Sequence, residues 1–217
     1  MHKPNNILTD DVRDELDYDP LLNDKRIVVK ADDGKVTLTG AVDSYPEVLR
    51  ATDDTMSVKG VTQVDNQLLV GLVGDAITDA QIAQQAAANL DSDRLVPHGS
   101  LKVAVSDGWA TVTGEVRHHF QVMAAKHDVG RVPGVLGIND KMTITANPIP
   151  SDVADRINRA FRRNAIIDDS LIDVTASGST VYLDGTVGSW RSMDEAVDTA
   201  WQAPGVADVV NRLVVVY

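Results

Sequence analysis

Apolar and polar residues alternate in three places along the chain, each time around a hairpin dipeptide. The apolar runs RIVVKA, LKVAV and LIDVTA precede Asp33-Gly34, Asp107-Gly108 and Ser177-Gly178. Gly and Asp tolerate the positive φ that tight hairpin turns require. Beyond each turn, apolar residues alternate with Thr, Asp or Tyr, at Val36/Leu38, Ala110/Val112 and Val181/Leu183. The pattern predicts three β-hairpins, each with one buried face.

Registered glycines show that each hairpin belongs to a longer repeat. Gly40, Gly114 and Gly185 are predicted to end the second strand of the three hairpins, with one extra residue before Gly185 in the third copy. Twenty residues after each comes a second glycine followed by Val, and these are Gly60, Gly134 and Gly205. Apolar residues then recur four, eight and ten positions further on in every copy. A spacing of 74 and 71 residues between copies predicts three tandem units.

Between the two glycines of each copy, the apolar spacing becomes helical. The residues 8, 11 and 15 positions after the first glycine form one helical stripe. They are Val48, Ala51, Thr55; Val122, Ala125, Val129; and Met193, Ala196, Ala200. A further helix is predicted upstream of each hairpin, because Thr9, Thr78 and Ser151 each precede Asp and suit an N-cap.

The predicted fold class is therefore α+β, with three tandem αββαβ modules. In each module we expect a three-stranded mixed sheet packed against two helices on one face, the second helix being the crossover between parallel strands. The expected domain ranges are 1–72, 76–146 and 149–217, with short linkers GLVGD at 71–75 and ANPIP at 146–150.

Composition narrows the classes of function. The 217 residues carry a net charge of -12, which disfavours bulk attraction to nucleic acid, and no cysteine, which excludes disulfides and thiolate chemistry. The first residues, MHKPNNILTDD, contain no apolar leader, and no run of 18 apolar residues occurs. We expect a cytoplasmic protein; a periplasmic one whose signal has been removed is the alternative.

The stretch DPLL-x3-RIVVKADDGKVTLTGAV, followed through a helix by KGVTQVDNQLLV, resembles a BON domain. The resemblance extends over nearly the whole chain as three copies, marked by the six registered glycines. It implies an αββαβ sandwich, a role in osmotic or envelope stress, and binding to phospholipid or envelope surfaces, and it does not imply catalysis. This chain departs from the osmotically induced type, which has two copies and an export signal.

Arginines cluster on the predicted first helix of the third copy, in an otherwise acidic chain. Arg156, Arg159 and Arg163 are expected on one face by their i, i+3, i+7 spacing, with Arg162 beside them. Arginine forks suit phosphate, so the cluster is a candidate seat for anionic headgroups. The alternative is a solvated face that pairs with Asp152, Asp155 or a neighbouring copy.

A ring stands five residues after the first glycine of every copy: Tyr45, His119 and Trp190. At the expected entrance of the second helix, such residues can anchor in a headgroup layer or contact a protein partner. Packing at the helix entrance is the alternative. Trp201, on the same helical side as Trp190, would extend that surface or pack between copies.

Acidic pairs recur where the first helix of each copy is expected to end: Asp17-x-Asp19, Asp91-x-Asp93 and Asp168-Asp169. Oxygen clusters can hold a cation, and some BON-containing relatives are linked to potassium, but EF-hand spacing is missing and turns also favour Asp. No phosphate-binding, dinucleotide-binding or nucleophile motif occurs. We therefore expect no catalytic residues, no metal site and no cofactor.

The leading hypothesis is a non-enzymatic binding or scaffold protein that contacts an anionic phospholipid surface or an envelope protein. Three weak sites at fixed spacing would raise its avidity. The alternatives are a soluble chaperone-like or protein-interaction module, and weak cation sensing. The sequence leaves the oligomeric state open.

Overall fold

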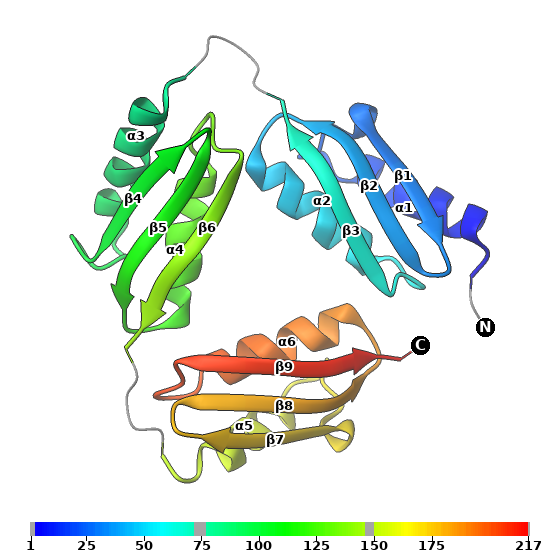
Figure 1. Ribbon diagram of the computed structural model, residues 1–217. Helices are drawn as coiled ribbons and strands as arrows, with labels where there is room; N and C mark the ends of the chain where they lie inside the picture. The colour runs from blue at the N-terminus through cyan, green and yellow to red at the C-terminus, as the bar shows by residue number, and fades with distance from the viewer. Residues whose placement is uncertain (1–2, 72–76, 146–149, 217) are drawn as a thin grey trace. The chain divides into compact units, whose positions relative to one another are not determined.

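One order of elements is repeated three times in the computed structural model, which describes residues 3–71, 77–145 and 150–216. Each module runs helix, strand, strand, helix, strand (Figure 1). Module 1 contains α1 (Asn5–Tyr18), β1 (Ile27–Asp32), β2 (Lys35–Val42), α2 (Tyr45–Ser57) and β3 (Gln63–Val70). Module 2 contains α3 (Asp79–Ser92), β4 (Leu101–Ser106), β5 (Trp109–Val116), α4 (His119–Gly130) and β6 (Gly137–Ile144). Module 3 contains α5 (Val153–Phe161), β7 (Ile172–Ser177), β8 (Thr180–Val187), α6 (Trp190–Trp201) and β9 (Asp208–Val215).

Every module has a three-stranded sheet in which the second strand is central. In modules 1 and 3 the first two strands pair antiparallel, and the third strand pairs parallel to the second. Two helices cover one face of each sheet, as Figure 1 shows. The predicted α+β class and the αββαβ module are confirmed. The limits expected for the modules and linkers fall mostly on 1–2, 72–76, 146–149 and 217, which lie outside the described residues.

Apolar side chains from both helices and from alternating strand positions form the core of each module. The cluster in module 1 is built around residues such as Leu8, Val36 and Leu38, and the cluster in module 3 around Phe161, Val181 and Leu183. These two clusters share no residue. The helical stripes predicted for the second helices are buried, except that Val48 is only partly buried.

The first registered glycine lies inside the central strand, so the prediction that it ends the strand is wrong. β2 continues past Gly40 to Val42, and β8 continues past Gly185 to Val187. Gly40, Gly114 and Gly185 have φ of +118°, +134° and +132°. A Cβ at Gly185 would lie 2.0 Å from the carbonyl oxygen of Leu171. Glycine is therefore required for both its backbone conformation and its lack of a side chain. The second set, Gly60, Gly134 and Gly205, also has positive φ.

The hairpin turns confirm the first two predicted dipeptides and correct the third. Asp33-Gly34 and Asp107-Gly108 have positive φ at both positions, as a type I′ turn requires. In module 3, Ser177 pairs with Thr180, so the turn is Gly178-Ser179 instead of Ser177-Gly178. The third copy therefore has no extra residue. Its turn has simply moved its glycine to the first central position, where Gly178 has φ of +62°.

Only one of the three predicted N-caps is found as expected. Thr78 caps α3 in a capping box with Gln81, where each side chain bonds the backbone of the other residue. Thr9 lies inside α1, which begins at Asn5, and its hydroxyl donates to the Asn5 carbonyl. Asp152 instead of Ser151 precedes α5. Thr9 faces the sheet, because its hydroxyl also accepts from the Ala31 backbone N–H.

The capping box at Thr78 gives a local prediction. We expect Thr78→Ala to lower the free energy of unfolding of module 2 by about 1 kcal/mol, because the N-terminal turn of α3 loses a hydrogen-bond acceptor. Amide hydrogen exchange of the full chain would show faster exchange in α3. Thr78→Ser, which keeps the hydroxyl, serves as the control, and equal exchange in the two variants would contradict the assignment.

Candidate binding surface

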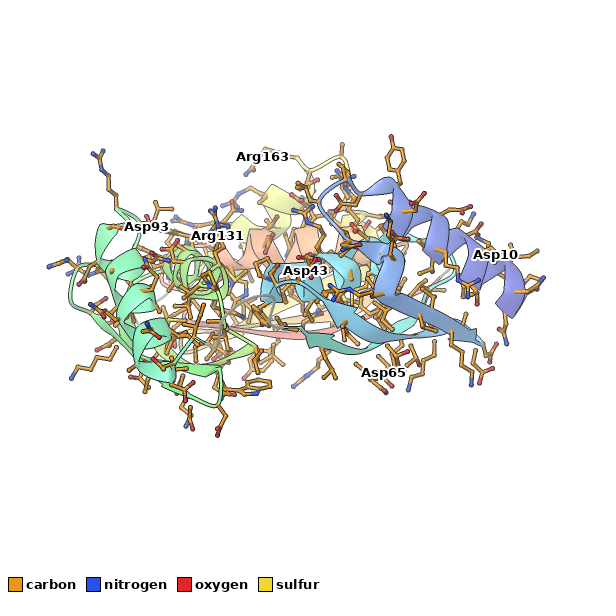
Figure 2. The ribbon with its side chains drawn as sticks, turned by 90° about the horizontal axis from the view of Figure 1, so that it is seen from above. Asp10, Asp43, Asp65, Asp93, Arg131 and Arg163 are labelled. Atoms are coloured by element: carbon orange, nitrogen blue, oxygen red, sulfur yellow. The ribbon has the colours of Figure 1, made fainter. Side chains whose placement is uncertain are left out.

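The structure divides the predicted arginine cluster. Arg156 and Arg159 are on α5, but α5 ends at Phe161, so Arg163 lies in the turn beyond it (Figure 2). The prediction of one continuous helical face over all three is therefore wrong. The chain leaves the helix at Asn164, whose side-chain oxygen accepts from the Ile166 backbone N–H at 2.9 Å.

Most of these arginines already have partners within module 3. Arg156 Nε lies 2.9 Å from Asp152 Oδ2, and this contact is the largest cause that lowers the pKa of Asp152. Arg162 Nε lies 3.1 Å from Asp169 Oδ2. Arg163 Nη1 donates to the Arg159 carbonyl near the end of α5, where the helix dipole favours positive charge. Most arginines of the cluster therefore form ion pairs or hydrogen bonds within their own module.

Each predicted ring is the first residue of a second helix: Tyr45 of α2, His119 of α4 and Trp190 of α6. Burial raises the pKa of the Tyr45 hydroxyl. The His119 ring stacks on Trp201 with centroids 4.0 Å apart, and Trp190 packs against the core of module 3. Each ring thus has a packing role, and the structure distributes the rings over three modules.

The acidic pairs shape the turns that follow the first helices. The Leu21 and Leu95 backbone N–H groups donate to Asp19 Oδ1 and Asp93 Oδ1 at 2.9 and 2.8 Å. Asp168 accepts from Ser170 in the same way. Over residues 3–71, 77–145 and 150–216, no three His, Cys, Asp or Glu side chains gather as a metal site would require.

The outward face of α4 is a candidate binding surface that the sequence reasoning missed. Its buried stripe is Val122, Ala125 and Val129. On the opposite side, Phe120 and Met123 are 52% and 50% exposed, although both are large and apolar. They share a stripe with His127 by i, i+3, i+7 spacing. The α4 face, as we call it, comprises Arg117, His118, Phe120, Met123, Lys126, His127 and Arg131.

Charge sets the α4 face apart from its counterparts in the other modules. Residues 117–131 have a net charge of +2, whereas the registered segments 43–57 and 188–202 have net charges of -3 and -2. Asp128, the one acidic residue of the first segment, is turned inward toward Asp93. The α4 face therefore combines exposed apolar side chains with positive charge at both ends.

Alignment of the three second helices carries the signal for this face. Nine residues after the first glycine stand Leu49, Met123 and Asp194, and six residues after it stand Pro46, Phe120 and Arg191. Module 2 alone has apolar residues without acidic neighbours at these positions. The ring at the helix entrance, His119, directly precedes Phe120 in the sequence.

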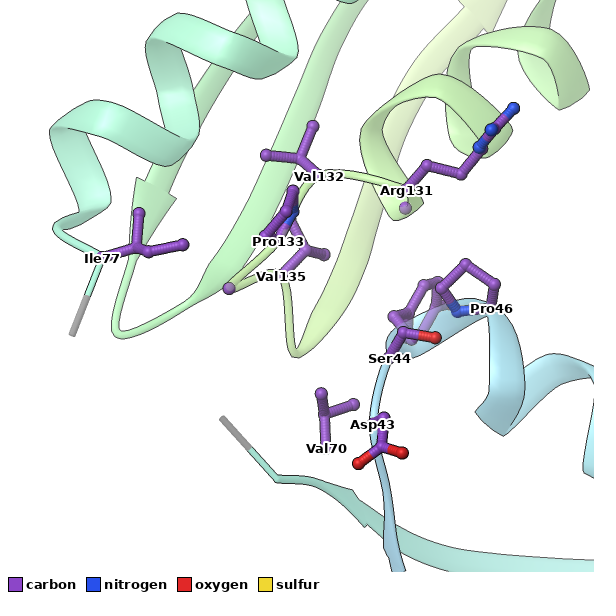
Figure 3. Close-up of a pocket in the computed structure, with 12 residues that line it drawn as sticks. Asp43, Ser44, Pro46, Val70, Ile77, Arg131, Val132, Pro133 and Val135 are labelled. Carbon is purple, nitrogen blue, oxygen red and sulfur yellow. The ribbon is translucent and has the colours of Figure 1, made fainter. Parts of the chain in front are cut away.

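Figure 3 shows residues that line a cavity of about 340 Å³. Its lining comes mainly from the start of α2, Asp43 to Pro46, and from the turn after α4, Gly130 to Val135. The Asp43 carboxylate accepts hydrogen bonds from Asn23 and Arg26, which lower its pKa. Asp43 is thus held ionised by its own module. Its geometry is that of a structural ion pair.

The repeated sandwich makes this chain a tandem array of small α+β modules. The second helix of module 2 carries the candidate binding surface. A family model described as the BON domain matches residues 4–71, 78–146 and 151–217. The chain therefore belongs to the BON domain family and contains three copies of the domain. None of the helices in the described residues is long and apolar enough to cross a membrane.

Osmotically-inducible protein Y of Escherichia coli strain K12 is a curated relative. It is 31% identical over 125 residues, which are 54% of this chain and 60% of that protein. Two solved structures of CdsD, a structural protein of the type III secretion system of Chlamydia trachomatis, align over 97% of this chain. The two alignments cover 92% and 98% of the CdsD chains, with sequence identities of 14% and 13% and TM-scores of 0.27 and 0.28.

Proposed function

We propose that this chain is a non-enzymatic binding protein of osmotic or envelope stress, which docks on anionic phospholipid surfaces through the α4 face. The similarity to osmotically-inducible protein Y supports the stress role. The observation that carries the binding role is the exposure of Phe120 and Met123 between cationic residues. Apolar side chains flanked by Lys, Arg and His suit a helix that lies in a headgroup layer.

The expected affinity of one module is modest. Removing the remaining exposed surface of Phe120 and Met123 from water contributes about 1 to 1.5 kcal/mol each. Arg117, Lys126 and Arg131 add about 1 kcal/mol each near an anionic surface. The total of roughly 5 to 6 kcal/mol corresponds to a Kd of about 0.1 mM. Binding is therefore reversible and needs millimolar lipid to be measured.

Co-sedimentation with vesicles tests this function. With vesicles of equal parts phosphatidylglycerol and phosphatidylcholine, we expect the full chain to bind at low salt and to dissociate at 0.5 M NaCl, because screening weakens exposed charge. We expect the double variant Phe120→Ser, Met123→Ser to bind at least about tenfold more weakly, a loss of about 1.4 kcal/mol.

Leu49→Ser is the matched control. Leu49 occupies the position of Met123 in module 1 and is 48% exposed, but it lies in the acidic segment 43–57. It should change binding less than twofold. Equal binding to pure phosphatidylcholine vesicles, or an unaffected double variant, would contradict the proposal. Suppression of protein aggregation without vesicle binding would favour the chaperone-like alternative.

A further inference from the structure

Two carboxyl groups face each other between the helices of module 1. Asp19, at the end of α1, accepts from the Leu21 backbone N–H and from Arg50 Nη1, both at 2.9 Å. Asp54 of α2 lies within hydrogen-bonding reach of Asp19. Its Oδ2 atom is buried and has no hydrogen-bond partner among the described residues. The pair therefore has acceptors in excess and lacks a donor.

Module 2 repeats this arrangement at the registered positions. Asp93 follows α3 (Figure 2) and accepts from the Leu95 backbone N–H at 2.8 Å. Asp128 of α4 lies within hydrogen-bonding reach of Asp93, and its Oδ2 is likewise buried without a partner among the described residues. In both modules the first Asp stands 21 residues before the first glycine and the second stands 14 residues after it.

Module 3 has no carboxyl group at either of the registered positions. The registered residues are Asn164 and Thr199. Asn164 keeps the turn by accepting from the Ile166 backbone N–H, and its Nδ2 donates to Glu195 Oε1 of α6 at 2.7 Å. Glu195 is registered with Arg50, so this bond takes the place of the Asp19–Arg50 bond, with donor and acceptor exchanged. In modules 1 and 2, a hydrogen bond between the two Asp side chains requires that one carboxyl group be protonated.

The directions in which the surroundings shift the pKa values of these carboxyl groups agree with this geometry. Burial, and then the neighbouring Asp19, raise the pKa of Asp54 to about 6, against opposition from Arg50; Glu15 adds a smaller rise. The Leu21 backbone N–H is the largest cause that lowers the pKa of Asp19, so the shared proton resides on Asp54. Burial and then Asp93 raise the pKa of Asp128, while His127 opposes them; Arg131 lines the same depression. Asp53 also faces Arg50.

We propose that modules 1 and 2 each hold a proton between two carboxyl groups that join their helices, so that acid tightens these two modules and leaves module 3 unaffected. This carboxyl clasp comprises Asp19–Asp54 and Asp93–Asp128. It acts on module stability and does not depend on the proposed lipid binding. Two like charges in a partly buried site cannot both remain ionised without cost.

The raised pKa of Asp54 determines whether module 1 becomes more or less stable as the pH falls. The folded state binds this proton more tightly than the unfolded chain, so stability increases as pH falls through about 6 toward the ordinary value of 3.8. The low pKa of Asp19 acts in the opposite direction only below that value. Between pH 7.5 and 5.0 the folded-to-unfolded ratio of module 1 is expected to rise up to about tenfold.

Amide hydrogen exchange of the full chain measures the protection of the backbone amides in each module separately. After correction for intrinsic exchange, we expect protection in modules 1 and 2 to rise from pH 7.5 to pH 5.0 at constant ionic strength, with module 3 unchanged. Asp54→Asn supplies a permanent donor, so it should raise protection of module 1 at pH 7.5 and remove its pH dependence. Asp14→Asn, at an exposed position on α1, is the control and should retain it.

A second variant keeps the test independent of how Asp54→Asn folds. Asn164→Asp places a carboxyl group opposite Glu195 and should make module 3 acid-dependent. Equal protection of wild-type module 1 at both pH values overturns the proposal, as does full pH dependence in Asp54→Asn. It is also overturned if added KCl or MgCl₂ at pH 7.5 protects module 1 as strongly as acid does, because the pair is then a cation site.

Discussion

Gly185→Ala is expected to unfold module 3. Gly185 has φ of +132°, a region that costs a residue with a side chain about 1 to 3 kcal/mol. The added Cβ would also lie 2.0 Å from the Leu171 carbonyl oxygen, at the place where β7 begins to pair with β8. A domain of this size has a stability of only about 3 to 10 kcal/mol. A combined loss above about 3 kcal/mol leaves the module largely unfolded.

Gly188→Ala is the control for this prediction. Gly188 lies three residues further along, and a Cβ there would meet nothing within 4 Å. It should change stability by less than about 0.5 kcal/mol. Amide exchange over residues 150–216 of the full chain measures both variants. Native protection in Gly185→Ala would show that the strands separate without cost and that the close approach is not what requires glycine.

The same close approach explains why the glycine recurs in every module. A Cβ at Gly40 would lie 2.0 Å from the Arg26 carbonyl oxygen, and one at Gly114 would lie 2.2 Å from that of Ser100. In each case the carbonyl belongs to the residue just before the first strand. The repeat is therefore marked by the point where the chain enters the hairpin against its central strand, and not by the end of that strand.

Local patterns predicted the module well, because its elements follow rules that act over a few residues. Alternation identified the hairpins, and the helical stripe identified residues such as Ala51 and Ala196, which are fully buried. The errors arose where alternatives are close in sequence. Ser177-Gly178 and Gly178-Ser179 are both plausible turns, and strand pairing decides between them. Thr9 resembles a cap, but the sheet uses its hydroxyl.

The binding surface was harder to predict, because exposure depends on which helix face meets the sheet. Phe120 and Met123 look like core residues until Val122 and Ala125 are seen to occupy the buried side of α4. The carboxyl clasp could not be predicted from the sequence either, because it depends on which side chains meet in the folded module. Asp19 was predicted as part of an acidic pair with Asp17, yet the carboxyl group that it faces is that of Asp54, which is 35 residues away in sequence.

The α4 face and the carboxyl clasp both arise because one scaffold tolerates different side chains at registered positions. The place held by Met123 is Leu49 in module 1 and Asp194 in module 3, and the place held by Asp19 is Asn164 in module 3. Because the backbone is fixed by the glycines and the core, such substitutions change the surface or the proton response of one module alone. Three copies can therefore divide tasks that a single domain would have to combine.

This division requires modules that are stable separately, and Leu38→Ala tests that. Leu38 of β2 is fully buried in the core cluster of module 1, and truncation of such a leucine costs about 3 to 5 kcal/mol. Leu69→Ala is the control, because Leu69 belongs to the same sheet but is 72% exposed. We expect Leu38→Ala to abolish amide protection over residues 3–71, and Leu69→Ala to preserve it. Protection over residues 150–216 should stay within about twofold of the wild type, because the two core clusters share no residue. A parallel loss in module 3 would show that the modules unfold as one cooperative unit, and their surfaces could not then be tuned separately.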